Sequence, residues 1–179
     1  TTGACGVHFA SLVGGACPAV VREEGWRPSA LMFRDEEVMA VVADRNTVSQ
    51  TPFHRHHTKL SLVRVDLTGG PHAVLAELLL DAGARVDSCV FHGELLYLTN
   101  QAHDQVMVFD TSGDRFRHLH DHDGFSFPHD VAVSDDGRWM AVSNYGMNEI
   151  RVRPLAPPHT PGTDAAVTPP DASSASPAG

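Results

Sequence analysis

Cysteine, lysine and long apolar runs are scarce in this chain of 179 residues. The three cysteines, Cys5, Cys17 and Cys89, lie far apart without a CxxC pair, which argues against a disulfide framework or a thiolate zinc site. We expect them to be small buried thiols. No apolar stretch approaches the roughly 18 residues of a membrane-spanning helix. The N-terminal residues lack the order of a signal peptide, so we expect a cytoplasmic protein, with a leader removed before Thr1 as the alternative.

Positive charge is also in short supply. The chain carries 13 basic and 22 acidic residues, which gives a formal net charge of -9, and Lys59 is its one lysine. The arginines are scattered, and an acidic surface repels phosphate backbones, so nucleic acid is excluded as a partner. With no membrane span either, we expect a small-molecule ligand or a protein as the partner.

Familiar catalytic signatures are missing as well, because the chain contains no GxSxG, GxGxxG or P-loop motif. The opening Thr1 and Thr2 are similar to the start of an N-terminal-nucleophile hydrolase, in which a threonine uses its own amine as the base. Such enzymes need sheets flanked by helices. The repeated strand patterns of this chain do not fit that architecture.

What the chain does have is alternation, seen most clearly in "FPHDVAVSDDGRWMAVSN" from Phe127 to Asn144. Val131 and Val133 alternate with smaller residues, "SDDG" has the residues of a tight turn, and "RWMAVSN" resumes the strand pattern. A third alternating stretch, residues 149–155, follows the "YGMN" turn. The pattern predicts a meander of three antiparallel strands.

The same order of strands and turns occurs twice upstream, in residues 28–67 and 86–110, with an insertion between Thr47 and His57 in the first unit. Each of these units is followed by a further stretch, residues 72–80 and 115–121, that predicts a fourth strand. The first of these stretches is rich in Leu and Ala, so a short helix is the alternative there. A four-stranded unit that recurs every roughly 40 to 50 residues is the signature of a β-propeller.

We therefore predict an all-β chain of about three four-stranded antiparallel blades, over residues 26–155. Residues 1–25 are predicted to supply the outer strands of an incomplete blade, and residues 156–179, rich in Pro, Ala and Ser, a disordered tail. Propeller rings have about four to eight blades, so three do not close one. Either the chain is part of a longer protein, or a homodimer completes the ring, or the sheet is open.

The third unit resembles the YVTN-type β-propeller repeat and the lactonase-type seven-bladed propellers. It shares with them Pro128, His129, the "SDDG" turn and "AVSNYGMNEIRV", and "YLTNQAHDQVMVFD" in the second unit matches the later half of the repeat. The resemblance covers about residues 28–153. It implies a propeller fold and, through the lactonase-type members, hydrolysis of a sugar lactone.

In propellers of this kind, ligands sit on one face around the central channel, near the starts of the inner strands and the ends of the second strands. The strand starts carry Ser29, Asp87, Ser88, His129 and Asp130, and the strand ends carry Asp44, Asn100 and Asn144. We expect Asp44, Asn100, Asn144 and Ser88 to bind sugar hydroxyls or a divalent cation, and His129, Asp87 and Asp130 to be catalytic. The alternative is structural, with Asp and Asn bonding turn backbone and His129 capping a neighbouring loop.

Two histidine clusters are further candidates. In "HLHDHD", an extended chain places His118, His120 and His122 on one side, as a zinc or nickel site requires, and Asp121 and Asp123 on the other. The alternative is a polar crossover between the second and third blades. In "FHRHH", residues 53–57, the histidines lie in the long insertion, where a solvated loop is the alternative to a metal site.

Two functions follow from these patterns. The first, which we prefer, is a binding or scaffold propeller that presents a polar channel face to a small ligand or a protein. The alternative is a lactonase-like, metal-assisted hydrolase of a sugar lactone or ester. The polar residues at matching positions change from unit to unit, which favours the first function.

Overall fold

The computed structural model describes residues 6–8, 19–22, 25–45, 57–66 and 71–155. Within these ranges the chain consists of β-strands joined by turns, with one short 3-10 turn at Tyr145–Met147. It contains no helix there that is long and apolar enough to cross a membrane. Thr1, His54, His56 and the predicted tail lie outside the described residues, so the predictions made for them are untested.

The first two blades are four-stranded antiparallel meanders in which each strand pairs with the next along the chain. The first contains β3 (Arg27–Phe33), β4 (Val38–Arg45), β5 (His57–Arg64) and β6 (Ala73–Leu79). The second contains β7 (Val86–His92), β8 (Leu95–Asn100), β9 (Gln105–Asp110) and β10 (Arg117–His122). The predicted fourth strands are thus confirmed. The helix alternative for residues 72–80 is wrong, because β6 pairs with β5 and Leu78 packs against the core.

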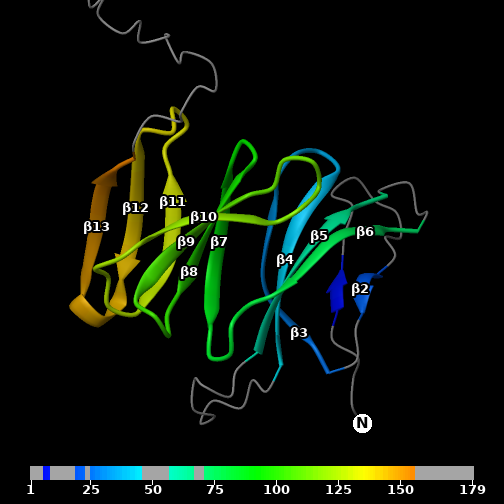
Figure 1. The fold of residues 1–179 in the computed structure, drawn as a ribbon, viewed down its shortest axis with the longest axis horizontal. Coiled ribbons are helices and arrows are strands. Elements are labelled where there is room, and N and C mark those ends of the chain that lie inside the picture. The colour runs from blue at the N-terminus through cyan, green and yellow to red at the C-terminus, as the bar shows by residue number, and fades with distance from the viewer. Residues whose placement is uncertain (1–5, 9–18, 23–24, 46–56, 67–70, 156–179) are drawn as a thin grey trace, which may run out of the picture.

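The third blade has three strands, β11 (Pro128–Val133), β12 (Trp139–Asn144) and β13 (Glu149–Pro154). In the described part of the chain no fourth strand pairs with β13. At the other end, β1 (Gly6–His8) and β2 (Ala19–Arg22) form a separate two-stranded sheet. Figure 1 shows the third, second and first blades and this hairpin side by side, from left to right.

Apolar residues between adjacent blades hold the blades together. Ala40, Val42 and Leu60 of the first blade are fully buried against a set from the second that includes Leu96 and Leu98. Strand β4 is buried along almost its whole length, because the second blade covers one of its faces and the β1 hairpin the other. This two-sided burial explains why its sequence, "VMAVVADR", is apolar at consecutive positions.

The second and third blades meet in an equivalent core. Tyr97 and Val108 of the second blade pack against Met140 and Val142 of β12, with Phe125 of the crossover between the blades. Each blade thus buries one face against its neighbour, as expected for a propeller. The sheets do not close into a ring within the described residues.

Within the described residues, the outer face of the third blade is left exposed. Ile150 is paired with Ser143 and Val152 with Ala141, so these side chains share the face that points away from Met140 and Val142. Trp139, Ile150 and Val152 are all exposed there. By contrast, the outer face of the first blade is partly covered, since Val7 of β1 packs on Met39, Val41 and Val63.

Candidate functional site

The starts of the inner strands of the second and third blades meet, as the strand alignment predicted. His129 Nε2 of β11 lies 2.9 Å from Asp87 Oδ2 of β7. The imidazole is 57% exposed and the carboxylate 26%, so the pair is reachable from solvent. With Nε2–H donated to Asp87, a neutral His129 carries its lone pair on Nδ1, which is the tautomer that a general base needs.

A second bridge lies beside the first. Ser88 Oγ donates a short hydrogen bond to Asp130 Oδ1, and the Asp130 N–H donates to Ser143 Oγ at 2.8 Å. Thr99 contacts both residues next to this bridge. Its Oγ1 accepts from the Ser88 N–H at 3.0 Å and lies 3.4 Å from the His129 carbonyl oxygen. The two bridges fix the relative position of β7 and β11.

Cys89 follows Ser88 in β7 and is buried. Burial raises the pKa of the Cys89 thiol to about 12, and the Asp130 carboxylate acts in the same direction. The thiol is therefore protonated at neutral pH and is no nucleophile. The prediction of a buried thiol is confirmed for Cys89, whereas Cys5 and Cys17 lie outside the described residues.

The polar residues at the second-strand ends are buried and bonded near their own turns. Asn100 Oδ1 accepts from the Arg85 N–H at 3.2 Å, and Asn144 Oδ1 accepts from the Ser126 N–H at 2.5 Å. Asp44 Oδ1 accepts from Thr58 Oγ1 at 2.7 Å. These contacts fit the structural alternative: Asn100 and Asn144 bind backbone of the connections between blades, and Asp44 binds a side chain of the neighbouring strand β5. Ser29, which is exposed, lies 3.5 Å from the Val42 carbonyl through its Oγ. Ligand binding by Asp44, Asn100 and Asn144 stays a prediction.

A hollow of about 430 Å³ opens beside His129 at the end of the third blade. It is lined by His129, Ser143, Asn144, Tyr145, Asn148, Glu149 and Ile150. The Tyr145 side chain is 71% exposed, and its ring centroid lies 6.2 Å from that of His129 and 6.0 Å from that of Phe127. The rings of Tyr145 and His129 therefore border the hollow, and the Phe127 ring lies next to that of Tyr145.

Local backbone contacts hold this aromatic group in place. The Gly146 N–H donates to the Ser126 carbonyl at 2.8 Å, and a Cβ on Gly146 would lie only 2.3 Å from Ser126 Oγ. Phe127 has a φ of 52°, which is uncommon for a bulky residue, and its N–H donates to Asp104 Oδ1 at 2.7 Å. Strained backbone of this kind persists only where its surroundings determine it, and it clusters at ligand sites.

Glu149 places an ion-paired carboxylate on the wall of the hollow. The Asn144 amide donates to Glu149 Oε1 at 2.8 Å, and the Arg151 guanidinium contacts the same oxygen. The hydrogen bond from Asn144, followed by that from Arg151, lowers the pKa of Glu149 below its ordinary value. Glu149 is therefore a carboxylate throughout the neutral and mildly acid range.

The predicted one-sided histidine row on β10 is wrong in one respect. The register of β10 against β9 shifts between His118 and His120, and His118 Nε2 lies 2.7 Å from Asp121 Oδ1, a residue expected on the opposite side. The rings of His120 and His122 contact each other edge to face at 4.9 Å. Among the described residues, no group of three or more His, Cys, Asp or Glu side chains is arranged to hold a metal ion.

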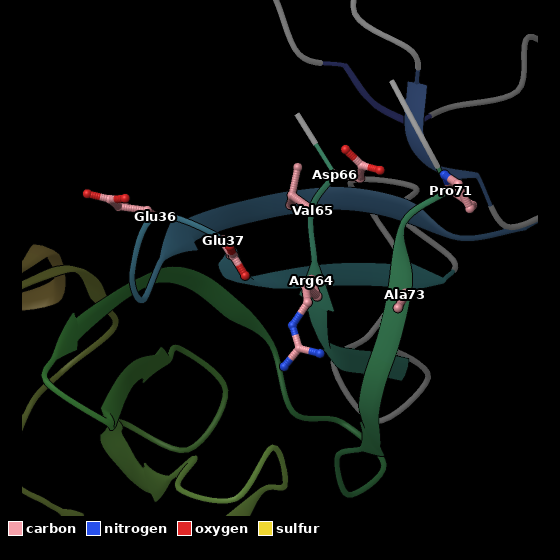
Figure 2. A pocket seen from close by; sticks show the side chains of 7 residues that line it. All are labelled: Glu36, Glu37, Arg64, Val65, Asp66, Pro71 and Ala73. Atoms are coloured by element: carbon pink, nitrogen blue, oxygen red, sulfur yellow. The ribbon is translucent and has the colours of Figure 1, made fainter. Parts of the chain in front are cut away.

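A second hollow, of about 530 Å³, lies at the opposite end of the first blade. Figure 2 shows the Arg64 side chain from β5 and Glu37 from the turn before β4 on its wall. Arg64 already donates to Asp114 of the second blade at 3.1 Å, and Arg34 donates to the same carboxylate at 3.2 Å. Arg64, the basic residue that lines this hollow, thus links the first and second blades.

Sequence reasoning missed Tyr145, Phe127 and Glu149 as site residues. The "YGMN" segment was predicted as a turn and Phe127 as the start of the repeat, so both were assigned structural roles only. An exposed aromatic residue in a turn that directly follows a predicted site position, Asn144, is the signal that was available.

Comparison with known proteins supports the fold. No family model and no curated protein sequence matches the chain, so the YVTN-type repeat stays a prediction. Among solved structures, the chain is similar to a putative 6-phosphogluconolactonase from Bacteroides fragilis, with a TM-score of 0.61, 14% identity, and coverage of 86% of this chain and 48% of the other.

Two further structures give the same result. The periplasmic gluconolactonase of Pseudomonas aeruginosa matches with a TM-score of 0.56, 16% identity and coverage of 79% and 43%. Hydrazine synthase of Kuenenia stuttgartiensis matches with a TM-score of 0.58, 15% identity and coverage of 77% and 49%. The chain thus spans about half the length of these proteins. Together with the separate four- and three-stranded sheets, this shows that the chain has the fold of a partial β-propeller.

Proposed function

We propose that this chain is a binding β-propeller segment that holds a small polyhydroxylated ligand in the hollow beside His129. The observation that carries the proposal is the convergence of Tyr145, His129 and Glu149 on one opening of about 430 Å³. Ligand sites in proteins combine apolar or aromatic walls with a few placed polar groups, and this hollow has both.

The chemistry of the lining suits a sugar-like ring. The exposed face of Tyr145 offers a surface on which the C–H face of such a ring can stack. Glu149, Ser143 and Asn148 supply acceptors and donors for hydroxyl groups. The fixed backbone at Gly146 and Phe127 holds the aromatic group before any ligand arrives, which reduces the entropy lost on binding.

The proposal is tested by saturation-transfer NMR with D-glucono-1,5-lactone at mildly acid pH, where the free lactone hydrolyses slowly. We expect transfer to the lactone protons, and a loss of affinity of about tenfold or more in Tyr145→Ala. Trp139→Ala is the matched control, because Trp139 is an exposed aromatic of the same blade that does not line the hollow. Equal binding by both variants would contradict a site at Tyr145.

A second candidate function, hydrolysis of a sugar lactone, is favoured by the 2.9 Å contact between Asp87 and His129. In this reaction His129 Nδ1 takes a proton from water, and the hydroxide attacks the lactone carbonyl carbon. The ring C–O bond then breaks, and the ring oxygen receives a proton to give the open-chain hydroxy acid. Asp87 orients the imidazole and stabilises its protonated form. The described residues do not fit a three-ligand metal site, so this scheme has no metal step.

Lactone opening is measured as acid release in a pH-stat. We expect His129→Gln to reduce kcat by about 100-fold or more, and Asp87→Asn to reduce it with little change in KM. His72→Gln, on the first blade, controls for the loss of an imidazole elsewhere in the fold. A rate in His129→Gln equal to that of the parent chain would reject hydrolysis at this site and leave the binding function standing.

We also propose that a second copy of the chain packs on the uncovered face of the third blade. The two interfaces between blades bury the equivalent faces of the first and second blades, whereas Trp139, Ile150 and Val152 are left exposed. The outer face of the first blade also exposes apolar side chains, at Leu31 and Val74. The chain covers about half the length of its propeller neighbours, so two copies supply the full arc.

A further inference from the structure

We infer that the hollow beside His129 selects an uncharged polyhydroxylated ring and rejects the phosphorylated form of the same ring. This inference rests on the proposed binding function and adds the charge of the ligand. Two of the similar structures differ in this feature by name, one being a 6-phosphogluconolactonase and the other a gluconolactonase. The fold alone does not decide between them, but the charges around the hollow do.

The side chains that line the hollow include one carboxylate, Glu149, and no lysine or arginine. A phosphate monoester is normally bound by arginine or lysine or by a row of backbone N–H groups. Here a phosphate dianion would face the Glu149 carboxylate instead. The bond from the Asn144 amide keeps that carboxylate ionised, so protonation does not remove the repulsion at neutral pH.

The nearest arginine is not available to a phosphate, because it is already paired with the Glu149 carboxylate. Arg151 contacts Glu149 through Nη2 and donates through Nη1 to the Gly124 carbonyl oxygen. Arg153, the other arginine of β13, donates to the Asp123 carbonyl at 2.6 Å and lies over the Phe125 ring. Both guanidinium groups are thus engaged with the crossover that precedes β11.

Further carboxylates lie close to the imidazole. Asp87 contacts the His129 ring, and Asp130 follows His129 on β11 and is exposed. A ligand that touches His129 therefore lies near the carboxylates of Glu149, Asp87 and Asp130, and the lining of the hollow offers it no lysine or arginine. These three carboxylates can accept hydrogen bonds from the hydroxyl groups of a ligand, and they weaken the binding of an anionic ligand.

The test compares D-glucono-1,5-lactone with its 6-phosphate ester by saturation-transfer NMR on the full chain. We expect the neutral lactone to bind at least about tenfold more tightly than the ester, and the difference to shrink as salt screens the carboxylates. Glu149→Gln, which retains the oxygen that accepts from Asn144, is expected to narrow the difference. Glu94→Gln removes an exposed carboxylate at the opposite end of the second blade and serves as the matched control.

The outcomes separate the inference from the proposed function. Equal or tighter binding of the ester overturns the inference and leaves a ligand site in the hollow. If the difference in affinity between the neutral lactone and its phosphate ester is unchanged in Glu149→Gln, the charge of Glu149 is not its cause. Failure of both lactones to bind overturns the proposed function and the inference together.

Discussion

Replacing Asn144 by alanine is the sharpest way to separate a structural from a ligand-binding role at the strand ends. Asn144 is fully buried, accepts from the Ser126 N–H and donates to the Glu149 carboxylate. The substitution removes a hydrogen bond to a charged group and leaves a backbone N–H without its acceptor. Loss of the acceptor for the Ser126 N–H costs about 1–3 kcal/mol, whereas water replaces the amide at the exposed Glu149 carboxylate, so we expect Asn144→Ala to lower the free energy of unfolding by about 2 kcal/mol.

Urea unfolding, followed by the fluorescence of Trp26 and Trp139, measures this loss directly. The expected change corresponds to a decrease in Tm of roughly 4–8 °C for a chain of this size. Ser143→Ala is the control, because its hydroxyl accepts one N–H, that of Asp130, at a partly exposed position that water can reach. We expect this control to lose about 1 kcal/mol or less.

A charged variant of the same residue adds a dependence on pH. Asn144→Asp keeps the oxygen that accepts from Ser126 but places a second carboxylate against Glu149. The repulsion raises the folded-state pKa of this pair above the ordinary range, so the variant is least stable at neutral pH and recovers as the pH falls.

Asn144→Ala with a stability within about 0.5 kcal/mol of the parent chain would refute the structural reasoning.

Three further predictions follow from other contacts. In Gly146→Ala the added Cβ would lie 2.3 Å from Ser126 Oγ. We expect the free energy of unfolding, measured by thermal unfolding, to fall by about 1–3 kcal/mol and lactone binding to weaken. Unchanged binding would show that this turn does not position Tyr145. The bond from Arg117 lowers the pKa of Asp110 to about 2, so the stability it contributes is present above about pH 4 and is lost as the pH falls towards 2. Arg117→Ala is expected to reduce the drop in the urea midpoint over that range, and an equal drop would contradict this source of acid sensitivity. Val152→Asp is expected to abolish a dimer seen by analytical ultracentrifugation of the parent chain, and a monomeric parent chain would overturn the second-copy proposal.

The blade pattern was predictable because it is local. Each hairpin is indicated in the sequence by alternating apolar residues and by turn-forming residues, and the structure has these residues in turn conformations. In "SDDG", for example, the Gly137 N–H donates to the Ser134 carbonyl at 2.8 Å, and Gly137 has a φ of 67°. The contact between Asp87 and His129 was also predictable, since both residues begin inner strands of adjacent units. Alignment of repeats places such residues next to each other without further information.

Other features of the site depend on register and could not be read from alternation. The bulge between His118 and His120 brings His118 to Asp121, and nothing in the alternating sequence "HLHDHD" marks where the extra residue falls. Similarly, the partners of Asn100 and Asn144 are backbone N–H groups of the crossovers, whose path the sequence does not specify. The residue types therefore predicted ligand binding, and the structure adds that both amides also bind backbone N–H groups.

The edge of β13 with which no described strand pairs has a consequence for how this chain behaves in concentrated solution. An edge strand is a template on which other extended chains can add, and "EIRVRP" alternates Ile150 and Val152 as such templates often do. Arg151, Arg153 and Pro154 interrupt this pattern with two positive charges and a residue that cannot donate a hydrogen bond. Charged residues and proline at an edge oppose aggregation, so we expect the same arginines that bind the crossover to disfavour the addition of further strands at this edge.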